Sequence, residues 1–290
     1  ERALLEFAQK NLLSKALERP DLVRQVVEKA KSDGMLSAFD SAKGRLSQPI
    51  ALGYSSAGYV VEASGSASIF KPGDRVACAG SGYASHAEFI TVPENLIVKI
   101  PGEMKFEEAA FVTLGAIALQ GLRLSKVELG DSIAVIGLGL VGQIVCQLAK
   151  TSGCIAYGID LDVSRAELAK QLGCENVFTS EKAIEDYVNQ TSSLGGVDHV
   201  IVCAASSNNR SVELAGRLAR HKGDVVVVGD VGMNIPRRTY YEKELNFIVS
   251  RSYGPGRYDP LYEEKGIDYP PAYVRWTENR NMEAFLDLIQ

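Results

Sequence analysis

The most regular pattern along the chain begins near residue 107, where short apolar runs alternate with amphipathic segments. The apolar runs have no polar face, which is typical of strands buried on both sides of a sheet. In the segments between them, apolar positions recur at the helical period of about 3.6. The alternation predicts an α/β fold with a doubly wound parallel sheet. The expected strands are 132–136, 155–159, 199–203 and 224–228, and the expected helices are 107–125, 140–151, 163–172 and 209–220, with a short strand and a helix between 172 and 199.

Between residues 49 and 101 the pattern changes to short β-rich runs bounded by Gly, Pro or Ser. Short strands spaced this closely predict a small antiparallel barrel or sandwich. The expected strands are 59–63, 74–79, 87–92 and 96–100.

The first part of the chain carries two apolar stripes at helical spacing, which predict a helical pair over residues 3–33. Pro20 suits the first turn of the second helix and Gly34 suits its end. We expect the pair to pack on a neighbouring domain. The second stripe consists of Leu22, Val23, Val26, Val27 and Ala30.

Composition narrows the class of protein. The 290 residues carry 31 basic and 36 acidic side chains, and this net charge of −5 argues against nucleic acid or an anionic membrane as a partner. No uncharged apolar run approaches the roughly 20 residues of a membrane helix, and no secretory signal is visible. Five cysteines without a Cys-x-x-Cys pair predict neither a disulfide framework nor a four-thiolate zinc lobe. We expect a cytoplasmic enzyme.

A glycine-rich motif, G-x-G-x-x-G, follows the strand at 132–136 and opens the next helix. Gly137 allows the tight turn, Gly139 lets a pyrophosphate approach the backbone, and Gly142 lets helix and strand pack closely. The helix N-terminus at Leu140 and Val141 offers unpaired N–H groups to phosphates. The motif in this position predicts a Rossmann domain that binds a dinucleotide.

Asp160 ends the next strand, 23 positions after Gly137, where a carboxylate meets the adenosine ribose. Because a carboxylate repels a 2′-phosphate, it favours NAD over NADP. Arg165 can contact the ribose or neutralise a phosphate.

The ends of the last two predicted strands carry small residues. Ligands of such sheets bind beyond the carboxyl ends of the strands, so these residues are candidates for the nicotinamide half of the site. They are equally explained as tight turns. The candidates are Ala204, Ala205, Gly229 and Asp230.

Taken together, these residues resemble the medium-chain dehydrogenase/reductase superfamily over about residues 48–250. The resemblance implies a chaperonin-10-like, barrel-type catalytic domain beside a Rossmann domain, with the active site between them. Four segments carry it in the family's order: Gly53–Val60 is similar to G-H-E-x-x-G-x-V, Pro72–Val76 reads P-G-D-R-V, Gly82–Pro93 is similar to G-x-A-E-y, and Gly130–Ser132 leads into the cofactor fold.

The departures from the family pattern bear on the metal. Tyr54 and Ser55 stand where zinc-dependent members carry His and Glu, and no thiolate occurs near Thr113. A catalytic zinc needs about three ligands from His, Cys and carboxylate, so we expect no metal. Thr113 is instead a candidate contact of the cofactor.

Without a Lewis acid, the substrate needs a proton donor such as a tyrosine. Tyr54 is the best candidate, although it can equally fill the space that a metal would take. Ser55 and Tyr83 are further catalytic candidates. The three histidines are given no such role.

Seven of the twelve tyrosines lie between Tyr240 and Tyr273, interleaved with arginines. Aromatic rings and guanidinium groups suit sugars and phosphates, but they equally suit a subunit interface. Tyr253 and Arg257 are candidate substrate contacts, and residues 245–250 are the expected edge strand of a homodimer.

The expected division is a catalytic domain at 1–106, a Rossmann domain at 107–255, and an aromatic and Arg-rich segment at 256–290 that leads back to the catalytic domain. The catalytic domain is expected to be incomplete at both ends of the chain. Residues 3–33 and 251–258 resemble a bacterial, zinc-free subgroup of polysaccharide gene clusters, often fused to a second dehydrogenase module.

The leading hypothesis is a zinc-independent, NAD-linked oxidoreductase, with NADP less favoured, acting on a polar alcohol or carbonyl such as a sugar or nucleotide sugar. A quinone or enone reductase is one alternative. A dinucleotide-binding regulatory module without turnover is the other.

Overall fold

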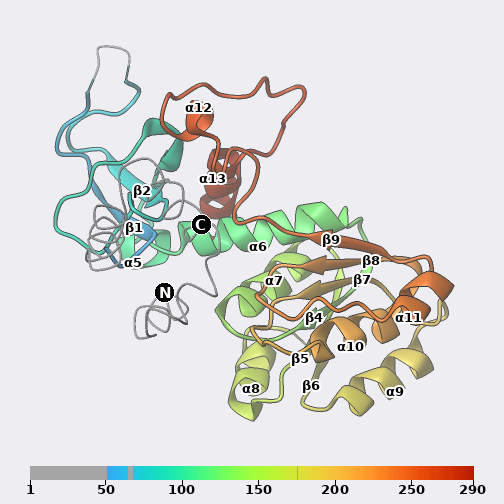
Figure 1. The fold of residues 1–290 in the computed structure, drawn as a ribbon. Coiled ribbons are helices and arrows are strands. Elements are labelled where there is room, and N and C mark those ends of the chain that lie inside the picture. The colour runs from blue at the N-terminus through green and yellow to red at the C-terminus, as the bar shows by residue number, and fades with distance from the viewer. Residues whose placement is uncertain (1–50, 65–67, 175) are drawn as a thin grey trace, which may run out of the picture.

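The computed structural model describes residues 51–64, 68–174 and 176–290. The helical pair expected at 3–33 lies outside the described residues. A β-rich part and a larger α/β part lie on either side of the long helix α6 (Val112–Ser125), as Figure 1 shows.

In the β-rich part, three short strands form an antiparallel sheet in the order β1-β2-β3. The apolar side chains of β2 supply its core, with four of its five residues buried. The elements are β1 (Ser55–Tyr59), β2 (Arg75–Ala79), the 3-10 turn η1 (Glu94–Leu96) and β3 (Ile97–Lys99).

Two strand predictions here were wrong. The strand expected at 59–63 is instead β1, which ends at Tyr59, and Val60 adds one more pair of hydrogen bonds with Gly73 and Asp74 beyond that end. Residues 87–92 form no strand, because among the described residues no strand pairs with them. The side chains of residues 86–89 are exposed, whereas Ile90 and Val92 pack against the core of this part.

The helix expected at 107–125 is divided into α5 (Phe106–Ala109) and α6. The division falls at Phe111, whose φ of −86° and ψ of 4° are not helical. The second helix ends at Lys126, which adopts a left-handed conformation with φ of 55°.

The α/β part is a six-stranded parallel sheet in the order β6-β5-β4-β7-β8-β9. The strand order reverses between β4 and β7, and ligands of such sheets bind at this crevice. The predictions for β4, α7 and β5 were confirmed residue for residue. The strands are β4 (Ser132–Ile136), β5 (Ile155–Ile159), β6 (Asn176–Phe178), β7 (Val197–Val202), β8 (Ala219–Val227) and β9 (Asn246–Val249), and the helices are α7 (Leu140–Thr151), α8 (Val163–Gln171), α9 (Glu181–Thr191), α10 (Arg210–Leu218) and α11 (Arg237–Glu242).

The sheet is covered on both faces, as its apolar strands predict. Ile133 and Val135 belong to the core shared with α6 and α7, whereas Ala134 and Ile136 belong to the core shared with α9 and α10. Alternate residues of β4 therefore serve two cores, which explains why its sequence has no polar face.

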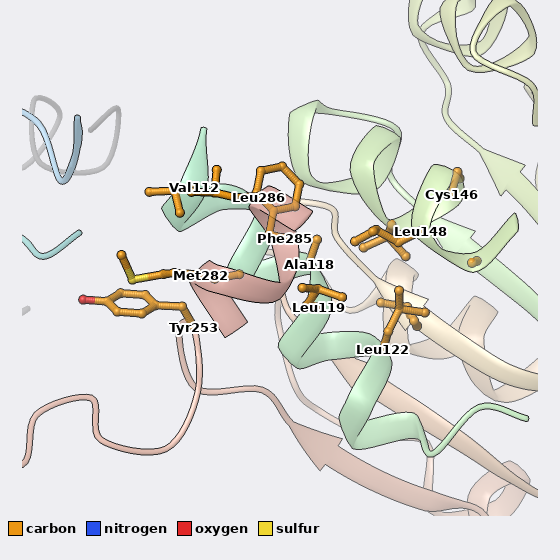
Figure 2. Close-up of a cluster of buried hydrophobic side chains, with 14 of the residues drawn as sticks. Val112, Ala118, Leu119, Leu122, Cys146, Leu148, Tyr253, Met282, Phe285 and Leu286 are labelled. Atoms are coloured by element: carbon orange, nitrogen blue, oxygen red, sulfur yellow. The ribbon is translucent and has the colours of Figure 1, made fainter. Parts of the chain in front are cut away.

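After β9 the chain runs through α12 (Pro260–Glu263) to α13 (Glu278–Leu288), which packs on α6. Figure 2 shows Met282, Phe285 and Leu286 of α13 beside the apolar side chains of α6. The approach is close, because a Cβ on Gly115 would overlap the ring of Phe285. A single core thus joins β2, α6, α7 and α13.

No helix in the described part of the chain is long and apolar enough to span a bilayer.

Candidate functional site

The turn between β4 and α7 is built from three glycines with different surroundings. Gly137 has a φ of +92°, and a Cβ there would lie 2.6 Å from the Ala204 nitrogen. A Cβ on Gly142 would overlap the Gly137 carbonyl oxygen. Around Gly139, by contrast, no described atom lies within 4 Å of a Cβ position. Two glycines are therefore needed for packing, and the third leaves open space in front of the helix.

This open space faces the N-terminus of α7. Gly139 is the N-cap residue of α7 and has no side chain that could accept hydrogen bonds from the first N–H groups of the helix. The first helical hydrogen bond runs from the Gln143 N–H to the Gly139 carbonyl at 2.9 Å. The N–H groups of Leu140 and Val141 lie in the first turn, where helix geometry leaves them without an intrahelical partner. Together with the helix dipole they form a site for phosphate oxygens.

Asp160 follows β5 and lies against the glycine-rich turn. One carboxylate oxygen accepts a hydrogen bond from Leu138 N–H at 2.7 Å, and the other accepts one from Asp162 N–H at 2.9 Å. The Arg165 guanidinium lies 3.7 Å from the Asp160 carboxylate. The structure thus brings the predicted Asp160 and Arg165 together with the turn, and each carboxylate oxygen keeps a further lone pair for a ligand hydroxyl.

The carboxyl ends of β7 and β8 complete this side of the crevice. A Cβ on Gly229 would overlap the Ala204 carbonyl oxygen, so the two backbones touch. Asp230 carbonyl accepts a hydrogen bond from Ser206 N–H at 2.8 Å, and both Ala205 and Asp230 are exposed. Ala204 contacts Gly137 as well, which places these predicted residues beside the glycine-rich turn. The residues present fit a dinucleotide.

Tyr54, Ser55 and Thr113 form a second group, at the start of α6. The Ser55 hydroxyl donates to the Ala110 carbonyl at 2.7 Å and accepts from Thr113 N–H at 3.3 Å. The Thr113 hydroxyl donates to the Tyr54 carbonyl at 3.1 Å, and Thr113 is fully buried. Ser55 therefore caps the first turn of α6 from a distant strand. These contacts give Ser55 and Thr113 a structural role at the start of α6, and the catalytic and cofactor contacts predicted for them stay predictions.

The Tyr54 backbone also meets the turn that carries Tyr83. Gly80 N–H donates to the Tyr54 carbonyl at 3.0 Å, and a Cβ on Gly80 would lie 3.1 Å from the Tyr83 ring. His86 packs on Gly53, where a Cβ would lie 2.5 Å from its ring. The two predicted tyrosines thus belong to one neighbourhood.

This neighbourhood does not fit a zinc ion. The Ser55 and Thr113 hydroxyls are engaged with the backbone, and hydroxyls are poor zinc ligands. Within residues 51–64, 68–174 and 176–290, no three His, Cys, Asp or Glu side chains cluster closely enough to hold a metal.

The predicted substrate contacts Tyr253 and Arg257 lie inside the protein. Tyr253 is 3% exposed, and the Arg257 side chain forms a buried ion pair with Glu263. Their burial contradicts direct contact with a substrate. The Arg257 guanidinium instead lies 3.9 Å from the ring centre of Tyr258, which is itself exposed.

Two buried polar residues were missed in the sequence. Gln143 follows the last glycine of the motif, and Glu278 begins α13. Glu278 is fully buried with no hydrogen-bond partner for either oxygen, and burial raises its pKa to about 9. The only feature of the sequence that could have drawn attention to Gln143 is its position directly after the glycine-rich motif. No feature of the sequence indicates that Glu278 is buried.

Comparison with known proteins gives two family matches in sequence order. Residues 26–102 match the alcohol dehydrogenase GroES-like domain, and residues 141–264 match the zinc-binding dehydrogenase domain. The fold and site define a GroES-like domain joined to a Rossmann-like, dinucleotide-binding domain. Both matched models are dehydrogenase domains, so the chain is similar in sequence to alcohol dehydrogenases built from these two domains.

Relatives of this chain are named dehydrogenases and reductases. It is 30% identical to the (R,R)-butanediol dehydrogenase of Bacillus subtilis (strain 168), over 52% of this chain and 50% of that protein. It is 28% identical to a probable D-xylulose reductase A of Arthroderma otae, over 76% of this chain and 71% of that protein. The galactitol-1-phosphate dehydrogenase from Escherichia coli superposes with a TM-score of 0.68 at 20% identity, over 83% of this chain and 73% of that one. The chain thus spans about half of the first relative and somewhat more of the others.

Proposed function

We propose that the protein transfers a hydride between a nicotinamide dinucleotide and a polar alcohol or carbonyl compound, of the polyol or sugar-derived class. The observation that carries the proposal is the glycine-rich turn, in which Gly139 leaves open space before the N-terminus of α7 while Asp160 lies beside it. The names of the relatives, which include butanediol and xylulose enzymes, support the substrate class.

The nicotinamide supplies the hydride chemistry, and the chain supplies binding and orientation. The N–H groups of Leu140 and Val141 hold the pyrophosphate, and Asp160 accepts the hydroxyls of the adenosine ribose. We propose NAD over NADP, because the Asp160 carboxylate lies with Asp162 where a 2′-phosphate would add negative charge. The half-exposed Arg165, 3.7 Å from both carboxylates, offsets part of that repulsion.

We further propose that the reaction needs no zinc, with Tyr54 or Tyr83 donating the proton to the substrate oxygen. All three histidines and all five cysteines belong to the described part of the chain, which contains no cluster of metal ligands. A neutral phenol within hydrogen-bond reach of a carbonyl can polarise it and exchange its proton with water.

We propose a homodimer formed through the edge of the parallel sheet. Within the described residues, β9 ends the strand order, and Val249 on it is 56% exposed. An exposed edge strand of this kind offers N–H and carbonyl groups to a second copy.

The test is a turnover screen of the full-length protein with NADH and NADPH against hydroxyketones, sugar ketones, quinones and enones. We expect turnover on a hydroxyketone or sugar ketone with NADH preferred. Quinone or enone reduction alone would support the alternative reductase, and cofactor binding without any turnover would support a regulatory module.

The variant Gly139→Ala tests the cofactor site directly. Its Cβ meets no protein atom within 4 Å and its φ is −66°, so the fold is expected to be unchanged while pyrophosphate binding is lost. Full activity in this variant would contradict the assigned cofactor site.

A further inference from the structure

Gln143 links three segments around the glycine-rich turn. It lies on α7 directly after Gly142 and is 5% exposed. Its side-chain amide donates one hydrogen bond to the Leu138 carbonyl at 3.0 Å and another to the Arg165 carbonyl at 2.9 Å. One buried amide therefore joins α7, the turn before it and the first turn of α8.

The Leu138 peptide is consequently held on both sides. Asp160 accepts its N–H at 2.7 Å, and Gln143 donates to its carbonyl. The Leu138 side chain is 1% exposed and packs 3.1 Å from a Cβ position on Gly158 of β5. Because Leu138 lies between Gly137 and Gly139, its orientation sets the direction of the turn toward the pyrophosphate.

The second hydrogen bond fixes the segment that faces the ribose. The Arg165 guanidinium lies 3.7 Å from both Asp160 and Asp162, and the Arg165 carbonyl is the acceptor of the Gln143 amide. The Gln143 amide thus adds a second link between the phosphate-binding turn and the ribose-facing segment, beside the direct hydrogen bond from Leu138 N–H to Asp160.

We propose that Gln143 is a positioning residue for the adenosine half of the cofactor, acting by clamping Leu138 and Arg165 at a fixed separation. The proposal rests on the proposed dinucleotide function. Loss of the amide removes the donor to the carbonyl of the buried Leu138 and removes the link from the turn to α8, which lets the two segments move apart.

The first test measures binding in Gln143→Met, which keeps the length of the side chain and removes its donors. We expect the Kd for NADH and for ADP-ribose to rise about tenfold, which corresponds to the net loss of one to two hydrogen bonds. The Kd for reduced nicotinamide mononucleotide, which lacks the adenosine half, is expected to stay within twofold. Gln147→Met is the matched control, because Gln147 lies one turn further along α7, is exposed, and donates only to the Gln143 carbonyl.

A second variant separates positioning from general loss of packing. In Gln143→Glu, an ionised carboxylate repels both carbonyl oxygens, whereas the protonated acid can donate to one of them. We expect its NADH affinity relative to the native protein to be lower at pH 8 than at pH 5. A defect in packing alone has no reason to recover at low pH.

The outcomes are distinguishable. If the native protein binds neither NADH nor NADPH, the proposed function fails and this inference fails with it. If the native protein binds NADH and a folded Gln143→Met binds NADH and ADP-ribose within twofold of it, the inference is overturned while the proposed function stands. An equal loss of affinity for reduced nicotinamide mononucleotide also overturns it.

Discussion

Glu278 is a carboxyl group placed where its charge is unfavourable. It is fully buried, neither oxygen has a hydrogen-bond partner, and Glu263 adds a like charge that the nearby Arg257 only partly offsets. Burial therefore raises the pKa to about 9 from an ordinary value of 4.5. In the folded protein at neutral pH this group is a neutral acid.

This raised pKa predicts how stability changes with pH. The unfolded chain ionises Glu278 above pH 4.5, whereas the folded protein holds it neutral until about pH 9, so its contribution favours folding below pH 4.5 and is lost as the pH rises to about 9. Glu278→Gln removes this dependence, and the difference in unfolding free energy between pH 5 and pH 8 should shrink by roughly 4 kcal/mol. Denaturant unfolding at the two pH values measures it. Glu264→Gln, an exposed neighbour, serves as the control, and an unchanged pH profile in Glu278→Gln would contradict the assignment.

At the residue scale, the sequence predicted which residues form the glycine-rich turn and the carboxylate beside it, while the roles of the cofactor and catalytic residues stay predictions. Gly137, Gly139 and Asp160 could be predicted because spacing after a strand determines where such residues lie. Gln143 and Glu278 depend on contacts between distant segments, which no local pattern encodes. The predictions for Tyr54 and Tyr83 remain untested.

At the scale of elements, α6 depends on a cap from another strand. Ser55 accepts the Thr113 N–H at 3.3 Å and donates to Ala110, so it satisfies the start of a helix more than fifty residues away in sequence. Ser55→Ala is expected to lower the unfolding free energy by about 1 kcal/mol and to leave kcat nearly unchanged.

The neighbouring Ser56 gives the matched comparison, because its hydroxyl is buried with no partner. Ser56→Ala should be neutral or slightly stabilising, since it removes an unpaired polar group. Thermal unfolding and steady-state kinetics of the two variants measure the difference. If a stable Ser55→Ala variant showed a tenfold fall in kcat, Ser55 would act directly in catalysis and not only as a cap of α6.

The elements themselves were predictable to different degrees. The strands and helices from β4 to β5 were predicted residue for residue, because their apolar runs are buried on both faces and their ends carry glycine or polar caps. The β-rich part was predicted less well, since segment 87–92 has strand-forming residues but no strand paired with it among the described residues. Whether a segment forms a strand depends on the neighbouring strands and side chains that it packs against, and the sequence of the segment alone does not show them.

At the scale of the whole molecule, the two parts are joined by the contact of α6 with α13. Gly115 permits this contact, because a Cβ at that position would overlap the Phe285 ring. Gly115→Ala is expected to lower the unfolding free energy by about 1–3 kcal/mol through overpacking. Thermal unfolding measures it, with Gly58→Ala as the control because no described atom lies within 4 Å of a Cβ there. Equal melting temperatures for Gly115→Ala and the native protein would contradict the close packing.

We propose that this chain directs hydride transfer from a nicotinamide dinucleotide without zinc. The most direct measurement uses full-length protein treated with a chelator, its zinc content determined, and NADH carrying deuterium at C4 of the nicotinamide. Mass spectrometry then follows the label into the alcohol formed from the hydroxyketone and sugar ketone panel. We predict that the label enters an alcohol product while zinc remains far below one ion per chain. Bound NADH with no label in any product, or transfer only after zinc is restored, would contradict the account.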